Sequence, residues 1–136
     1  MKHNVYLYLL PMLLLLVACG APRPTMIQHV VLIKLNDSNQ RAALIDDCNR
    51  LLPGINGVSS YWCGSPDQSG RVSPAIDTNW DVALCVGYPD ADAYGAYVAD
   101  PAHVVLVDTW KARFQWLRIH DVSLDQNVHS QPTIRE

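Results

Sequence analysis

The chain has 136 residues, which is room for one domain of ordinary size once a targeting segment is removed. Its 49% of hydrophobic and 17% of charged residues are typical of a globular protein and exclude a disordered one. The formal net charge of -3 argues against a nucleic acid or an anionic lipid surface as the partner.

Residues 1–18 have the pattern of a signal peptide. Lys2 lies in a short start segment, an apolar run extends from Leu9 to Val17, and small residues precede Cys19. This run is shorter than the roughly 20 residues that a bilayer-spanning helix needs. The sequence LVAC at residues 16–19 resembles the lipobox of bacterial lipoproteins, in which cleavage precedes the cysteine. The alternative is an ordinary secretory signal whose cysteine is accidental.

The lipobox resemblance implies an anchored protein of the bacterial cell envelope. Cys19 would carry the lipid, palmitate included, and residues 19–26 would form a short tether, since stable anchoring needs more than one acyl chain. Gly20 stands where an aspartate would retain the protein at the inner membrane, so the periplasmic side of the outer membrane is favoured in a cell with two membranes. Loss of Lys2 lowers Lys+Arg from 10 to 9 against 13 acidic residues, and the net charge becomes -4.

Seven elements are expected after the tether. The segment 27–35 alternates like a strand but is apolar on both faces in its middle, so both faces should be covered. Asp37 or Ser38 can cap the following helix, which Pro53-Gly54 ends near Leu52. Residues 65–79 are rich in Ser, Pro, Gly and Asp and should form an exposed loop. Further strands are expected at 58–64, 80–88 and 115–124, and further helices at 89–99 and 100–114.

The order of these elements is strand, helix, strand, strand, two helices, strand. This order matches the split βαβ, or ferredoxin-like, plan, an α+β fold with an antiparallel sheet. We therefore expect a single ferredoxin-like domain over residues 27–124, followed by a flexible tail at 125–136.

Four pieces of the chain carry a resemblance to a known family. They are IQHVVLIKL near the start of the domain, LPGINGV, WDVALCVGYPDADAYGAYVADPAHV, and HDV in the last strand. In this order and spacing they resemble the Dabb family, the stress-responsive dimeric α/β-barrel domain. The resemblance implies a homodimer in which the sheets of two subunits pack face to face as a barrel, and this explains the doubly apolar first strand.

The resemblance also suggests site residues. His29, Tyr97 and His103 match positions that line the cleft of plant polyketide cyclases of the family and perform their acid/base chemistry. A further histidine of those enzymes falls at Val82 here, so one catalytic partner is missing.

His103 can be placed from the residues alone. Asp100 can serve as N-cap and Pro101 as the first helical residue, which puts His103 in the first turn. The positive end of the helix dipole disfavours imidazolium there, so a neutral ring is expected. His103 could then act as a base, with Tyr97 orienting it. The alternative is that these residues are satisfied polar groups that pin the helices to the sheet.

Other polar and sulfur-containing residues are assigned as follows. Cys48, Cys63 and Cys85 cannot all pair, and the sequence leaves their pairing open, although Cys63 and Cys85 could face one another across the long hairpin. Cys48 is expected to point at the sheet. His120 and Asp121 are interpreted as residues of an edge strand or dimer interface, with Trp116 and Arg118 on the face of His120.

Two functions remain as hypotheses. The leading one is a lipid-anchored dimer that binds a small apolar or aromatic molecule, or a protein partner, in a cleft with few polar groups. The runner-up is an enzyme of proton transfer beside a carbonyl, such as a cyclase, lyase or isomerase, with His103 as base, Tyr97 as its partner and His29 holding the substrate. No cofactor or metal is implied because CxxC and Cys/His ligand spacings are absent from the sequence. Haem or oxygenase chemistry has no specific support, and a metal held by backbone carbonyls at a subunit junction stays open.

Overall fold

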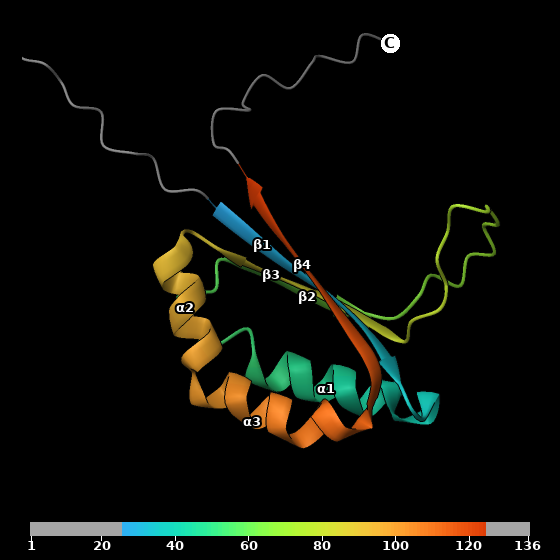
Figure 1. Cartoon of the computed structure of the whole chain (residues 1–136), viewed down its shortest axis with the longest axis horizontal. Coiled ribbons are helices and arrows are strands. Elements are labelled where there is room, and N and C mark those ends of the chain that lie inside the picture. Colours follow the sequence, from blue (N-terminus) through green and yellow to red (C-terminus); the bar gives the residue numbers. More distant parts are fainter. Residues whose placement is uncertain (1–25, 125–136) are drawn as a thin grey trace, which may run out of the picture.

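The computed structural model describes residues 26–124, so the expected signal peptide, Cys19, residues 20–25 of the tether and the tail 125–136 lie outside the described residues. The described chain is a four-stranded antiparallel sheet with three α-helices on one face (Figure 1). This is the expected ferredoxin-like α+β fold. Its elements are β1 (Met26–Leu35), α1 (Arg41–Leu51), β2 (Ser60–Gly64), β3 (Val82–Tyr88), α2 (Ala91–Ala99), α3 (Pro101–Trp110) and β4 (Phe114–Leu124), with 3-10 turns at Ser38–Gln40 and Lys111–Arg113.

The strands lie in the order β2-β3-β1-β4, so β1 is central and β4 is an edge strand. Antiparallel pairing places His29 of β1 opposite Val86 of β3 on one side and Asp121 of β4 on the other. Residues that lie opposite one another share a face of the sheet. The register therefore brings His29 and Asp121 together on the face that the helices cover.

The core fills the space between that face and the helices. Alternate residues of β1 point into it because side chains alternate along a strand. On the helix side, the indole N–H of Trp110 donates to Asp47 Oδ2 at 3.0 Å, which ties α3 to α1. The core residues from the sheet and helices include Val31, Ile33, Leu84, Val86, Tyr88, Leu44, Leu52, Leu106 and Trp110.

The break between α2 and α3 follows from two residues. Asp100 ends α2, and its carboxylate accepts a hydrogen bond from the Ala102 N–H at 2.8 Å as the N-cap of α3. Pro101 is the first residue of α3, where a missing N–H costs no hydrogen bond. The break sets Tyr97 at the end of one helix beside His103 at the start of the next, with ring centroids 4.6 Å apart.

No helix covers the second face of the sheet, which we call the open face. Gln28, Val30, Leu32 and Lys34 of β1 point to it, since their neighbours in the strand face the helices. The open face also carries Trp62, which is 53% exposed, together with Trp116, Arg118 and His120 of β4. The open face is thus apolar in places and uncovered in the single chain.

The register contradicts one expectation about the cysteines. Cys63 pairs opposite Leu84 and Cys85 pairs opposite Trp62, so the two thiols lie on opposite faces of the sheet and cannot form a disulfide. Cys48 does point at the sheet, as expected, and is buried. None of the helices within residues 26–124 is long and apolar enough to cross a bilayer.

A buried carboxylate fastens the start of β3 to β1 and α1. Asp81 is 1% exposed and accepts hydrogen bonds from the Leu35 N–H at 3.0 Å and from Arg41 Nη2 at 2.8 Å, while Lys34 Nζ lies 3.1 Å away. Burial alone would raise the pKa of Asp81, but these donors hold it well below its usual range. Asp81 is therefore a charged contact inside the fold.

We predict that Asp81→Asn lowers the free energy of unfolding by about 2 kcal/mol, because the Leu35 N–H and the partly exposed Arg41 and Lys34 cations lose their charged acceptor. Since the pKa of Asp81 is lower in the folded than in the unfolded chain, its stabilisation is complete above the unfolded pKa of about 3.9 and is lost as the pH falls towards the folded pKa. Urea denaturation between pH 2 and 7 measures both effects. Asp46→Asn, on the exposed side of α1, is the matched control, and equal stability of the two variants would contradict the prediction.

Candidate functional site

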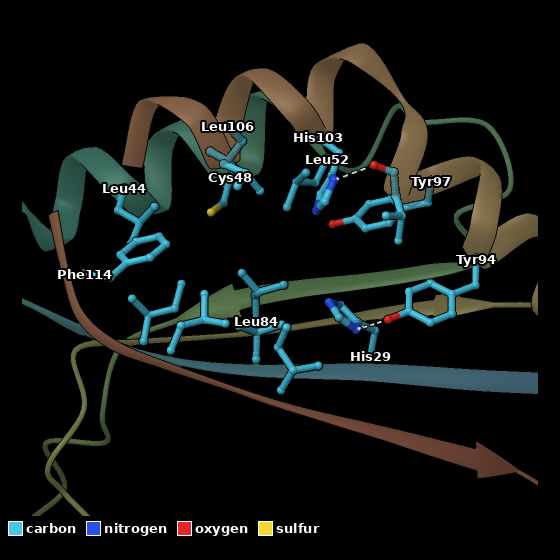
Figure 2. Close-up of a pocket in the computed structure, with 16 residues that line it drawn as sticks. His29, Leu44, Cys48, Leu52, Leu84, Tyr94, Tyr97, His103, Leu106 and Phe114 are labelled. Carbon is cyan, nitrogen blue, oxygen red and sulfur yellow. Dashed lines mark hydrogen bonds between the residues drawn. The ribbon is translucent and has the colours of Figure 1, made fainter. Parts of the chain in front are cut away.

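A cavity of about 310 Å³ lies between the helix-facing side of the sheet and the three helices (Figure 2). Most of its wall is aliphatic. Several of its lining residues at α2, α3 and β4 are also exposed, so its mouth lies between these helices and the edge strand. The lining residues are His29, Val31, Ile33, Leu44, Cys48, Leu52, Leu84, Tyr94, Tyr97, Val98, His103, Leu106, Val107, Phe114, Leu117 and Ile119.

His29, Tyr94 and Asp121 form a hydrogen-bonded group on the sheet side, which we call the His29 cluster. His29 Nδ1 lies 2.6 Å from Asp121 Oδ1 and 3.0 Å from the Tyr94 hydroxyl, which donates to Asp121 Oδ2 at 3.0 Å. A carboxylate only accepts hydrogen bonds, so Nδ1 carries the proton of a neutral His29 ring. Nε2 is then the acceptor, and it points into the cavity (Figure 2).

Tyr94 remains protonated in this cluster. Burial and the hydrogen bond to Asp121 raise the pKa of Tyr94 to about 12. Its ring also stacks on that of Tyr88 with centroids 4.9 Å apart. Tyr94 therefore holds the Asp121 carboxylate in place beside His29.

His103 lies on the opposite wall, at the start of α3. Its Nδ1 is 3.0 Å from the Val98 carbonyl oxygen, which can only accept, so Nδ1 again carries the proton. Burial lowers the pKa of His103, and the Val98 carbonyl opposes this effect only in part. The neutral ring expected from the sequence is thus favoured mainly by burial, and its Nε2 faces the cavity (Figure 2).

Tyr97 fills the space between the two histidines. It is buried, with its ring centroid 6.3 Å from that of His29 and 4.6 Å from that of His103. Burial raises the pKa of Tyr97, so the hydroxyl stays protonated at neutral pH. Figure 2 shows this hydroxyl pointing towards the cavity.

The structure brings the three candidate residues of the sequence, His29, Tyr97 and His103, to one cavity. It adds Tyr94 and Asp121, which sequence reasoning missed. Tyr94 precedes Tyr97 by three residues, a helical spacing that puts both on one face and could have revealed it. The sequence predicts Asp121 on an edge strand or at a dimer interface; β4 is an edge strand, and its register places Asp121 beside His29.

Two further positions named from the sequence lie elsewhere. Val82 is buried but does not line the cavity. His120 points to the open face, with Arg118 stacked over the Trp116 ring at 4.4 Å. Among residues 26–124, no three His, Cys, Asp or Glu side chains gather so that they could hold a metal ion.

The arrangement defines a chemical environment. Two imidazole Nε2 acceptors face a mainly aliphatic cavity from opposite walls, and a tyrosine hydroxyl lies between them.

A sheet with helices on one face and such a cavity beneath them defines a ferredoxin-like domain with a ligand-sized site. Residues 27–124 match the model of the Dabb family, described as the stress responsive A/B barrel domain. The chain belongs to the Dabb family.

Solved structures agree with this assignment. A Dabb family protein with a ferredoxin-like fold from Mesorhizobium loti is 25% identical, with a TM-score of 0.59 over 72% of this chain and 95% of its own. A dimeric ferredoxin-like protein of unknown function from Thermobifida fusca is 20% identical, with a TM-score of 0.62 over 75% and 93%. The hydroxynitrile lyase from Passiflora edulis is 11% identical, with a TM-score of 0.61 over 77% and 97%. The last two show the fold alone. No protein of curated function matches the chain significantly.

We predict that His103 titrates below the ordinary histidine pKa of about 6.5 and that its neutral ring carries the proton on Nδ1. The cause is burial, which penalises the charged ring. Nitrogen-15 NMR of the imidazoles between pH 4 and 8 measures both the pKa and the tautomer. A pKa above 6.5, or a proton on Nε2, would contradict the assigned geometry.

Proposed function

We propose that this protein binds a small, largely apolar or aromatic molecule in the cavity, as a lipid-anchored dimer at the bacterial cell envelope. One observation carries the binding proposal: two histidines, each with Nδ1 hydrogen-bonded to an acceptor, direct Nε2 into a mostly aliphatic cavity from opposite walls. A volume of about 310 Å³ is in the range of ligand pockets, which are mostly apolar with a few placed polar groups.

The acceptors favour a ligand with hydrogen-bond donors. Both Nδ1 atoms are occupied, by Asp121 and by the Val98 carbonyl, so the protons of the rings point away from the cavity. A hydroxyl or amino group on a ring would satisfy these acceptors, whereas a carboxylate would leave them facing another acceptor. A neutral aromatic molecule with a hydroxyl or amino substituent is the class that best fits.

The proposal includes a dimer through the open face. Half-exposed apolar residues and Trp62 occupy this face, and a second copy would cover them in an isologous contact. The similar protein from Thermobifida fusca is described as dimeric, which supports the same assembly here. Light scattering at micromolar concentration should give twice the mass of the chain, and a monomer would contradict the barrel.

The envelope location rests on the sequence at residues 1–19. The lipobox-like LVAC predicts a lipid on Cys19, and residue 26, where the described domain begins, follows only seven residues later. Cys19→Ser should therefore abolish labelling of the protein by palmitate and leave the precursor, with residues 1–18 still attached, uncleaved. Palmitate labelling of Cys19→Ser equal to that of the wild type would contradict the anchor.

A second candidate function is proton transfer next to a carbonyl. The observation that favours it is the 2.6 Å contact between His29 Nδ1 and Asp121, because a carboxylate that orients a histidine raises the ability of Nε2 to take a proton. In this reading His29 is the base that the geometry favours, and His103 accepts a hydrogen bond from the substrate. Tyr97 would donate its hydroxyl proton to the carbonyl oxygen as charge develops there.

We predict that filling the cavity mouth abolishes ligand binding. Ile119 lines the cavity and is 49% exposed, so Ile119→Trp can place a large ring in the mouth without overpacking the core. N-phenyl-1-naphthylamine, a neutral aromatic dye with one N–H, is the probe, and its fluorescence titration should show at least about tenfold weaker binding, equivalent to ~1.4 kcal/mol. Val105→Trp, on the exposed side of α3, is the matched control. If Ile119→Trp binds the dye as tightly as Val105→Trp does, the binding proposal is contradicted.

We predict for the second candidate that His29→Gln slows deuterium exchange at the carbon beside the carbonyl of phenylacetone by at least about 100-fold, the usual size of a lost general base. Proton NMR in deuterium oxide follows the exchange. His120→Gln, on the open face, is the control. If the wild type exchanges no faster than His29→Gln, the cavity performs no proton transfer of this kind.

A further inference from the structure

Two thiols meet on the helix side of the sheet, outside the histidine site. Cys48 is a buried residue of α1 whose sulfur points down towards the sheet (Figure 2). Cys63 of β2 lies opposite Leu84, a cavity residue, so it faces the same helices. Cys63 packs against the buried core cluster that contains Cys48, and Tyr61 of β2 donates to Asn49, the residue after Cys48. The neighbouring thiol raises the pKa of Cys48 and lowers that of Cys63. The pair therefore consists of one buried thiol of α1 and one partly buried thiol of β2 in the same core cluster.

The position of β2 gives access to the Cys63 thiol. β2 is the edge strand at the far side of the sheet from β4, and Cys63 is only partly buried. The hydroxyl of Tyr61, on the same strand, also faces α1, where it donates to Asn49 at 3.0 Å. A reagent can thus approach Cys63 from the sheet edge, whereas Cys48 is fully buried and lines the cavity.

The third described cysteine differs from this pair. Cys85 lies on the open face, where its thiol contacts Gln28 Oε1 at 3.1 Å, and burial raises its pKa. It is separated from Cys63 by the sheet itself. Cys85 is therefore the natural internal control for any chemistry of the pair.

We propose that Cys48 and Cys63 are a modification site at which a disulfide-containing thiol oxidant forms a reversible disulfide between α1 and β2. The Cys63 thiolate attacks one sulfur of the oxidant disulfide, which breaks and releases the other sulfur as a thiolate. The Cys48 thiol then gives up its proton and attacks Cys63 Sγ, and the second sulfur of the oxidant leaves as a thiolate. The two cysteines lose two electrons and two protons, and the oxidant disulfide becomes two thiols.

Oxidation at this site has consequences for the fold and for the cavity. The disulfide closes a ring of residues 48–63 and restricts the unfolded chain, which stabilises the folded state. It also joins α1 to the sheet edge and converts the Cys48 thiol of the cavity wall into a fixed disulfide sulfur. Such disulfides persist in exported compartments, which agrees with the proposed envelope location.

The test is peptide mapping of the purified full chain after exposure to oxidised glutathione. Trypsin cuts after Arg41, Arg50 and Arg71, so Cys48 and Cys63 fall in peptides 42–50 and 51–71, while Cys85 falls in 72–111. The folded chain should yield peptides 42–50 and 51–71 joined by a disulfide, and Cys85→Ser should yield the same pair. Cys63→Ser should lose it. The oxidised wild type should melt roughly 10 °C higher than the reduced protein.

Two results would overturn the proposal. One is a folded chain that yields no joined 42–50 and 51–71 peptides, although the same chain oxidised in guanidinium does yield them. The other is a joined pair that includes peptide 72–111 instead. Because the wild-type chain is the main sample, the result does not depend on how well the serine variants fold. It is also independent of ligand binding, so its failure is separate from that of the proposed function.

Discussion

The antiparallel pairing of β1 with β4 is the constraint on which the site depends. It places Asp121, on an edge strand, directly opposite His29 on the central strand. The resulting contact of 2.6 Å fixes the proton on Nδ1 and directs Nε2 away from the sheet, towards the helices. A shift of one residue in this register would turn His120 towards the helices and Asp121 to the open face. The histidine would then lose the group that orients it.

The second constraint is the helix break at Asp100-Pro101, which positions His103 on the helix side of the cavity, opposite His29. It begins α3 at a position where His103 can donate from Nδ1 to the Val98 carbonyl at the end of α2. Each histidine is therefore held by an acceptor outside the cavity and presents its free nitrogen inside it. Burial in the aliphatic lining lowers the pKa of His103, which favours its neutral form. We therefore propose that the two walls together bind a molecule that donates hydrogen bonds.

The sequence predicted the fold well because its signals are local. Alternation in residues 27–35, the caps at Asp37 and Asp100, and the turn at Pro53-Gly54 each act within a few residues. The site was predicted only in part. The role of Asp121 depends on pairing with a residue 92 positions away, and no local pattern encodes that register. The proposed facing of Cys63 and Cys85 was wrong for the same reason, because residues 65–81 between the strands hide which residues lie opposite one another.

We propose that the two imidazole acceptors bind a small donor-bearing molecule in the cavity. A crystal structure of the protein purified from the cells that naturally make it, at a resolution that shows ordered water, tests this proposal directly. We expect a retained molecule between the walls, with hydroxyl or amino groups within about 3.2 Å of His29 Nε2 and His103 Nε2. A cavity in which both nitrogens bind only water, or in which a retained molecule places a carboxylate against them, would contradict the proposal.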